Sequence, residues 1–224
     1  MKTLLALASL LMLAACGSGG PPPPDWKVDS ADLVARYQKH ALRGENTLAE
    51  RYFRQAVAAT GGAGRVGETA RLWLVHCATR RAMLIDDACT EYAELAPLEP
   101  NAADQVYYHF VTLRWEAVAT AQLPSQHRDL VSAAAGKRHE VLGRIEDPLA
   151  RLLDASLLVM RREADAATLA LAAETASAQG WRQPLLTYLK LQEKQAAARG
   201  DTTEQARLAR RIQLVEQSLA PGDK

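Results

Sequence analysis

Apolar side chains recur every three or four positions through almost the whole chain after Asp25. The segment that carries Leu33, Val34, Tyr37 and Ala41 is typical. This spacing places the apolar residues on one face of an α-helix, whereas a half-buried strand would alternate apolar and polar residues. No convincing alternating run occurs in the sequence. The pattern therefore predicts an all-α protein.

Glycines, prolines and capping residues divide this pattern into ten or so segments, which predicts antiparallel helices joined by short loops. Asn46 is a favourable N-cap, and Gly44 and Gly200 are expected to end helices. The expected helices cover residues 29–44, 46–60, 67–83, 86–97, 101–122, 125–135, 138–145, 147–162, 165–179, 183–200 and 201–218.

Two stretches of the helical pattern carry small and aromatic residues at matching offsets. They resemble the tetratricopeptide repeat over residues 31–100, in which a small residue lets two helices approach and an aromatic one fills the gap to the next hairpin. The copies lie 39 residues apart rather than about 34, and Tyr37 and His76 stand where a small residue is usual. The matching residues are Gly44, Ala49, Phe53 and Ala56, and then Ala88, Tyr92, Leu95 and Pro100.

This resemblance implies antiparallel helical hairpins stacked as a degenerate tetratricopeptide-like solenoid. Such solenoids present an extended concave surface that usually recognises other proteins. Residues 101–180 match the repeat poorly. An irregular helical bundle is the structural alternative.

The N-terminus has the pattern of a secretory signal. Lys2 precedes a short apolar run, residues 4–13, that is too short to span a bilayer. Residues 13–16, LAAC, resemble the bacterial lipobox. The resemblance implies cleavage before Cys16, acylation of its thiol and new amino group by chains such as palmitate, and stable anchoring in a membrane. An ordinary signal peptide with an accidental cysteine is the alternative.

The segment that follows Cys16 is rich in glycine and proline and is expected to be a tether. Gly17, rather than an aspartate, follows the cysteine. In lipoproteins of Gram-negative bacteria this implies the outer membrane, at its periplasmic face. The expected organisation is a signal peptide over 1–15, the lipidated cysteine and tether over 16–28, an all-helical repeat domain over 29–219 and a disordered tail over 220–224.

The charge of the expected mature chain is balanced. Removal of Lys2 leaves 26 Lys and Arg residues against 26 Asp and Glu residues. A nucleic-acid-binding protein would carry a basic excess, so no nucleic acid partner is expected. The balance also gives no attraction to anionic lipid, so membrane attachment is expected through the lipid on Cys16 alone.

Two further cysteines, Cys77 and Cys89, lie twelve residues apart. An exported protein folds in an oxidising compartment, where an even pair can form a disulfide. Two buried thiols are the alternative, because cysteine is common in apolar cores. The spacing alone leaves both interpretations open.

Motifs for catalysis and cofactor binding are weak. Residues 62–67, GAGRVG, fit GxGxxG, but an alanine-rich helix precedes them where a dinucleotide site needs a strand. No GxSxG sequence occurs, and no glutamate is set apart by its surroundings. We therefore predict no cofactor, no metal site and no enzymatic activity. The histidines show no metal-binding spacing: they are His40, His76, His109, His127 and His139.

Aromatic residues are scarce, at 5% of the chain, so each large ring deserves an explanation. In helical repeats such rings either pack between neighbouring hairpins or line the binding face, and packing is the commoner outcome. The candidates for partner binding are Trp73, Tyr107, Tyr108, Trp115 and Trp181.

Together these features predict an outer-membrane lipoprotein that acts as a non-catalytic scaffold for an envelope protein partner. The alternative is a helical protein that binds cell wall or lipid, or an enzyme that acts on peptidoglycan. A deep apolar pocket or a groove with a buried glutamate would favour the alternative. A shallow face with exposed tyrosine and tryptophan would favour the scaffold.

Overall fold

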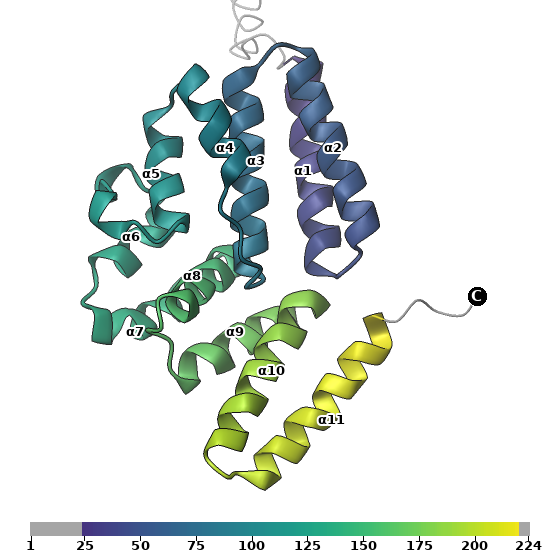
Figure 1. Ribbon diagram of the computed structural model, residues 1–224, viewed down its shortest axis with the longest axis vertical. Coiled ribbons are helices and arrows are strands. Elements are labelled where there is room, and N and C mark those ends of the chain that lie inside the picture. Colours follow the sequence, from purple (N-terminus) through teal and green to yellow (C-terminus); the bar gives the residue numbers. More distant parts are fainter. Residues whose placement is uncertain (1–23, 220–224) are drawn as a thin grey trace, which may run out of the picture.

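The computed structural model describes residues 24–219, and this part of the chain is helical throughout, with no strand. The predicted signal peptide (1–15), Cys16, most of the tether and the predicted tail (220–224) lie outside the described residues. Eleven α-helices and four short 3₁₀ helices make up the described part (Figure 1). None of these helices combines the length and hydropathy that a membrane crossing needs.

The first three helices are long and pack side by side. They are α1(Asp25–Leu42), α2(Asn46–Gly62) and α3(Val66–Ala82). Helix α1 begins four residues earlier than predicted, so residues 25–28 belong to the helical domain and not to the tether. Pro24 is extended (ψ 144°) and directly precedes the helix, and the Trp26 ring lies 5.3 Å from the Arg65 guanidinium. The GAGRVG segment is the α2–α3 turn and follows a helix.

In the first tetratricopeptide-like copy the small and aromatic residues pack between helices, as predicted. Ala49, Phe53 and Ala56 are all buried, and the Phe53 ring contacts Tyr37 with centroids 5.1 Å apart. In the second copy Tyr92 is buried, but Ala88 is exposed and lies in a loop. The small residue of that copy therefore does not sit at a helix–helix contact.

The central segment is built from short helices. In chain order these are α4(Thr90–Leu95), η1(Ala96–Leu98), α5(Ala102–Val111), η2(Trp115–Ala117), η3(Thr120–Gln122), α6(Ser125–Ser132), η4(Ala135–Lys137) and α7(Arg138–Leu142). They lie to one side of α3 in Figure 1.

Two predicted boundaries in this segment are wrong. The predicted helix over 101–122 ends at Val111, because Leu113 has a left-handed backbone (φ 67°) that turns the chain. The predicted helix over 86–97 begins only at Thr90, because Cys89 is also left-handed (φ 54°). A helix cannot continue through such residues, and neither is a glycine.

The last four helices are α8(Pro148–Met160), α9(Ala166–Ala178), α10(Arg182–Ala198) and α11(Thr202–Leu219). Two of their starts are fixed by aspartate caps, as the sequence predicted. Asp147 accepts a hydrogen bond from the Ala150 amide at 2.6 Å, and Asp165 accepts one from the Thr168 amide at 2.7 Å. Such caps satisfy amide groups that have no partner within the helix.

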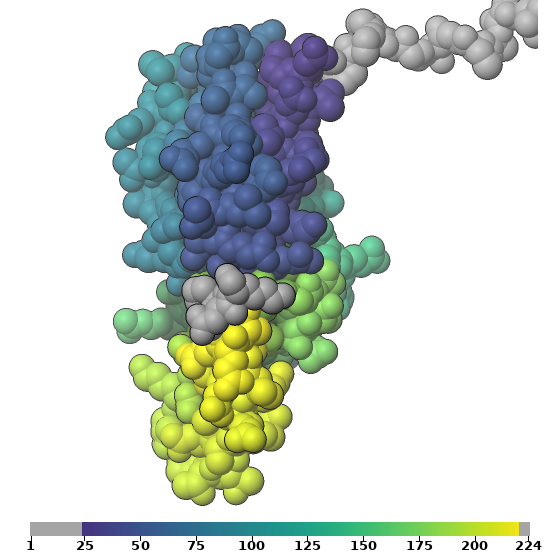
Figure 2. All heavy atoms as spheres, turned by 90° about the vertical axis from the view of Figure 1, so that its right-hand side faces the viewer, coloured from purple at the N-terminus to yellow at the C-terminus, as the bar shows by residue number. Residues whose placement is uncertain are grey.

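Helices α3 and α8 lie at the centre of one continuous core that extends from α1 to α9 and reaches Tyr188 of α10. Their contact joins the first helices to the last across the central segment (Figure 1). A second, smaller cluster holds the α10–α11 hairpin together and consists of Leu189, Ala196, Leu208 and Ile212. In Figure 2 α11 lies along the surface of the lower lobe.

Arg182 fastens this hairpin to the first two helices. Its guanidinium donates hydrogen bonds to the Arg43 carbonyl at 3.2 Å, to the Glu45 carboxylate at 2.9 Å and to the Ser218 carbonyl at 2.9 Å. One side chain at the start of α10 thus joins the α1–α2 turn to the end of α11.

Candidate functional site

All five predicted partner-binding aromatics belong to the core or pack against it, and Tyr107 and Tyr108 also line open spaces. Trp73 meets Phe53 edge-on with ring centroids 4.8 Å apart, and Trp181 packs against the core at the start of α10. Trp115 is 7% exposed and donates its indole N–H to the Phe110 carbonyl at 2.9 Å. The structure therefore does not offer Trp115 to a partner.

Two arginines explain why the Trp115 ring is covered. The guanidinium carbons of Arg161 and Arg138 lie 4.3 Å and 4.7 Å from its ring centre. Both arginines also pair with Glu163, at 2.8 Å and 2.6 Å. This cluster joins η2, α7 and the end of α8, so its function is structural.

Cys77 and Cys89 form a disulfide, with Cα atoms 5.3 Å apart. It joins α3 to the loop before α4. Asp87 organises the same loop, because its carboxylate accepts from the Cys89 amide at 2.8 Å and from Arg80 at 2.7 Å. Asp87 and the two sulfurs lie within 4.8 Å of one another, but bonded sulfurs are not thiolate ligands for a metal.

The neighbouring Tyr107 and Tyr108 face two different spaces. Tyr108 lies in an open groove between α4, η1 and α5, which we call the tyrosine groove. The Tyr92 and Tyr108 rings are 4.9 Å apart, and the Arg114 guanidinium lies 4.7 Å from the Tyr108 ring centre. The groove has a volume of about 340 Å³ and is lined by Tyr92, Ala93, Ala96, Pro97, Pro100, Asn101, Gln105, Tyr108, His109 and Arg114.

The electrostatics of the tyrosine groove are simple. Burial raises the pKa of Tyr92 to about 12, so its hydroxyl keeps its proton at neutral pH. Burial and the nearby Arg114 charge lower the pKa of His109, so its ring is neutral. None of the described residues that line the groove is acidic, and Arg114 is its charged group. The groove thus combines two aromatic rings and two prolines with one positive charge.

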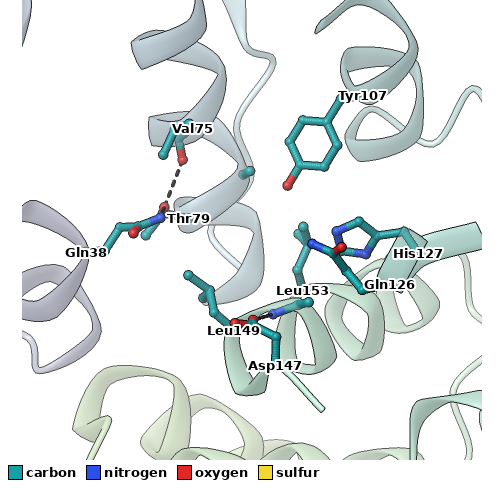
Figure 3. A pocket seen from close by; sticks show the side chains of 11 residues that line it. Gln38, Val75, Thr79, Tyr107, Gln126, His127, Asp147, Leu149 and Leu153 are labelled. Carbon is teal, nitrogen blue, oxygen red and sulfur yellow. Dashed lines mark hydrogen bonds between the residues drawn. The ribbon is translucent and has the colours of Figure 1, made fainter. Parts of the chain in front are cut away.

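Tyr107 lies instead in a cavity of about 170 Å³ where α1, α3, α5, α6 and α8 meet (Figure 3), which we call the histidine cavity. At roughly 30 Å³ for each water molecule, this volume holds about five waters. Its lining mixes amide, hydroxyl and apolar groups, from Gln38, Val75, Ala78, Thr79, Tyr107, Gln126, His127, Asp147, Leu149, Ala150 and Leu153.

His127 is 2% exposed and pairs with the fully buried Asp154 of α8, Nδ1 to Oδ1 at 2.6 Å. Burial raises the pKa of Asp154 to about 6, and the His127 hydrogen bond opposes this shift. The second oxygen of Asp154 is buried and has no partner among the described residues. The pair therefore holds the imidazole in one orientation beside the cavity.

Sequence reasoning missed this pair. His127 appears in the sequence as one of five histidines without metal-binding spacing, and Asp154 was not singled out. The available signal was a lone aspartate in the apolar run LLDASLLVM of α8, since carboxylates are rarely buried without a partner.

A glutamate, Glu146, lines a third and open groove of about 570 Å³ beside α6 and the start of α8, but it is exposed rather than buried. No glutamate lines either the tyrosine groove or the histidine cavity within residues 24–219. Comparisons with protein-family models, with curated proteins and with solved structures find no match to this chain.

Proposed function

We propose that this protein is a non-catalytic scaffold, anchored by a lipid on Cys16 to the periplasmic face of the outer membrane, that holds an envelope protein through the tyrosine groove. The proposal includes the finer description of the fold. In it, the helices before and after the central segment are stacked as tetratricopeptide-like hairpins, and α4–α7 form an irregular insertion.

The tyrosine groove is the observation that carries this proposal. Tyrosine and arginine are enriched among the residues that dominate binding energy at protein interfaces. Here the two rings and the arginine are next to one another, and Pro97 and Pro100 keep the wall rigid. A rigid aromatic surface loses little conformational entropy when a partner binds.

The lining also defines the chemistry of the partner. An apolar or aromatic side chain can pack on the Tyr108 ring, which the buried Tyr92 supports from below, and against the two prolines. An acidic residue beside it would pair with Arg114, because none of the described lining residues already supplies a carboxylate. We therefore propose an extended peptide segment with an apolar residue next to an acidic one.

A pull-down with the full-length protein tests the docking surface. Tyr108→Ala should reduce recovery of the envelope partner at least tenfold after crosslinking in cells. Tyr52→Ala is the matched control, because it removes a half-buried tyrosine from α2 on another part of the surface. Equal recovery of the same protein with Tyr108→Ala and wild type would contradict the proposed surface.

Mass spectrometry of the mature N-terminus tests the anchor separately. The proposal requires a triacylated Cys16 in the membrane fraction. Cys16→Ala should release the protein from that fraction and lower recovery of the partner. An unmodified Cys16 in wild type would contradict the anchor and leave the groove to be judged on the pull-down alone.

A further inference from the structure

The histidine cavity contains polar groups that the described chain itself leaves without partners. The Tyr107 hydroxyl points into the cavity toward His127 and Gln126 (Figure 3) and makes no hydrogen bond within residues 24–219. The rings of Tyr107 and His127 are 5.8 Å apart. Tyr107 is only partly buried, so its hydroxyl is open to a polar molecule that enters the cavity.

Asp154 determines what His127 can offer to such a molecule. A carboxylate only accepts hydrogen bonds, so Nδ1 of His127 carries the proton that it shares with Asp154. In the tautomer that carries its proton on Nδ1, Nε2 is an acceptor, and the described hydrogen bond of this ring is the one from Nδ1 to Asp154. The cavity therefore has a fixed acceptor, Nε2, beside a donor and acceptor, the Tyr107 hydroxyl.

The charges around the cavity select against ions. No lysine or arginine lines it among the described residues, so it has no group to neutralise an anion. Its one carboxylate, Asp147, already accepts from the Ala150 amide at the positive end of α8. The positive end of α8 offsets part of the Asp147 charge, so a cation gains less from this carboxylate than from an isolated one.

The remaining walls suit a ring with apolar faces. Leu149, Leu153 and Val75 supply hydrocarbon, whereas Gln38 and Gln126 supply amides. The Gln38 amide nitrogen donates to Thr79 at 3.3 Å, which leaves the amide oxygen as a further acceptor. The lining thus offers both donors and acceptors, which suits a ligand rich in hydroxyl groups because each hydroxyl can donate and accept.

A second open space of about 240 Å³ borders the cavity. It shares Val75, Tyr107, Gln126 and His127 with the cavity, and the Arg71–Asp104 ion pair, at 3.0 Å, forms part of its wall. These four side chains line both spaces and form the boundary between them. A ligand longer than one ring can extend past them toward the surface.

We propose that the histidine cavity binds an uncharged sugar ring, with one hydroxyl donating to Nε2 of His127 and a neighbouring oxygen accepting from Tyr107. Nε2 of His127 and the Tyr107 hydroxyl give specificity by hydrogen bonding, and Leu149 and Leu153 contact the C–H face of the sugar. This inference is independent of the proposed scaffold, because it uses neither the lipid anchor nor the tyrosine groove.

Saturation-transfer NMR on the full-length protein tests the proposal. The probes are glucose, galactose and N-acetylglucosamine, with glucuronate and glucosamine as charged counterparts. We expect at least one neutral probe to bind, and we expect the charged counterparts to bind at least tenfold more weakly.

Three variants locate the binding. Tyr107→Phe and Gln126→Ala should each weaken binding of the neutral probe at least fivefold. The latter is the safer variant for folding because Gln126 is largely exposed. Tyr188→Phe is the matched control, since it also removes a buried tyrosine hydroxyl but lies in α10, away from the cavity.

Three results would overturn the proposal. The first is the absence of binding by all three neutral probes at millimolar concentration. The second is binding that Tyr107→Phe and Gln126→Ala leave unchanged. The third is stronger binding of a charged probe than of its neutral counterpart.

Discussion

The body of the molecule, helices α1 to α9, and the C-terminal hairpin of α10 and α11 are stabilised to very different degrees. The body has one continuous core that includes large side chains such as Phe53, Phe110 and Leu157, together with a disulfide. The hairpin has a separate core cluster of only four buried residues, and Leu214 of α11 is 60% exposed. Both candidate sites lie in the body.

This difference predicts that the hairpin opens more easily than the body. Segments with few buried apolar contacts open locally at a lower free energy than the rest of the protein. The hairpin fits that description, and Arg182 with the α9–α10 contact attaches it to the body. The sites, in contrast, lie against the continuous core of the body, which helps to keep their side chains in position.

The largest expected effect is on the body core. Phe53→Ala should lower the free energy of unfolding by about 3–5 kcal/mol, because the ring is 1% exposed and contacts Tyr37, Trp73 and His76. Urea denaturation followed by circular dichroism measures the loss. A change below about 1 kcal/mol would show that this aromatic cluster is not part of the cooperative core.

Loss of the disulfide should have the next largest effect. The double variant Cys77→Ala/Cys89→Ala should lower the free energy of unfolding by about 3 kcal/mol, because the bond closes a loop of about a dozen residues in the unfolded chain. Reduction of the wild type with dithiothreitol should reproduce this loss, and dithiothreitol should leave the double variant unchanged. A reductant effect of equal size on the double variant would contradict the account.

Asp154 should make the stability of the body depend on pH. Its pKa is raised from 3.8 to about 6, so between about pH 4 and 6 the folded protein keeps a proton that the unfolded chain has lost. The free energy of unfolding, taken relative to Asp154→Asn, should fall as pH rises through this window and then level off. The full change corresponds to at most about 3 kcal/mol.

Denaturation of both proteins at a series of pH values gives this comparison directly. Asp154→Asn is the matched variant because it keeps the size of the side chain and an acceptor for His127. A difference that rises with pH, or one that does not change between pH 4 and 6, would show that burial of Asp154 has been misjudged.

The hairpin should show the smallest and most local effect. Leu208→Ala should cost about 2–3 kcal/mol in the local stability of α11, with little change in the urea midpoint of the body. Amide hydrogen exchange should speed up in α11 and the second half of α10. Faster exchange throughout α1–α9 would mean that the hairpin and the body unfold as one unit.

The sequence predicts the all-helical class and many helix boundaries, because these depend on local chemistry. Asp147 and Asp165 cap helices that begin where predicted, and Gly200 follows a helix end with the positive φ that glycine allows. The predicted N-cap Asn46 is wrong, because Glu45 precedes α2 and Asn46 is its first helical residue. The central segment was harder, because Leu113 ends α5 in the same conformation without being a glycine. That conformation is set by tertiary packing, which a local pattern does not record.

The candidate sites were predicted less well for a related reason. Tyr107 and Tyr108 were singled out as aromatics, but their assignment to two different spaces depends on the positions of α3, α4 and α8. The His127–Asp154 pair joins residues 27 positions apart, and neither residue is distinctive without the other. The spacing of Cys77 and Cys89 allowed either a disulfide or two buried thiols, and only the fold decides between them.

The most direct test of the account places a photo-crosslinking amino acid at position 108 in the tyrosine groove or at position 214 on the hairpin, each in the full-length protein in living cells. Position 214 is a suitable control because Leu214 is well exposed and far from the groove along the fold. The account predicts one discrete envelope-protein adduct from position 108 that is lost in Cys16→Ala, and no matching adduct from position 214. The same adduct from position 214, with none from position 108, would contradict the claim that the body carries the binding function.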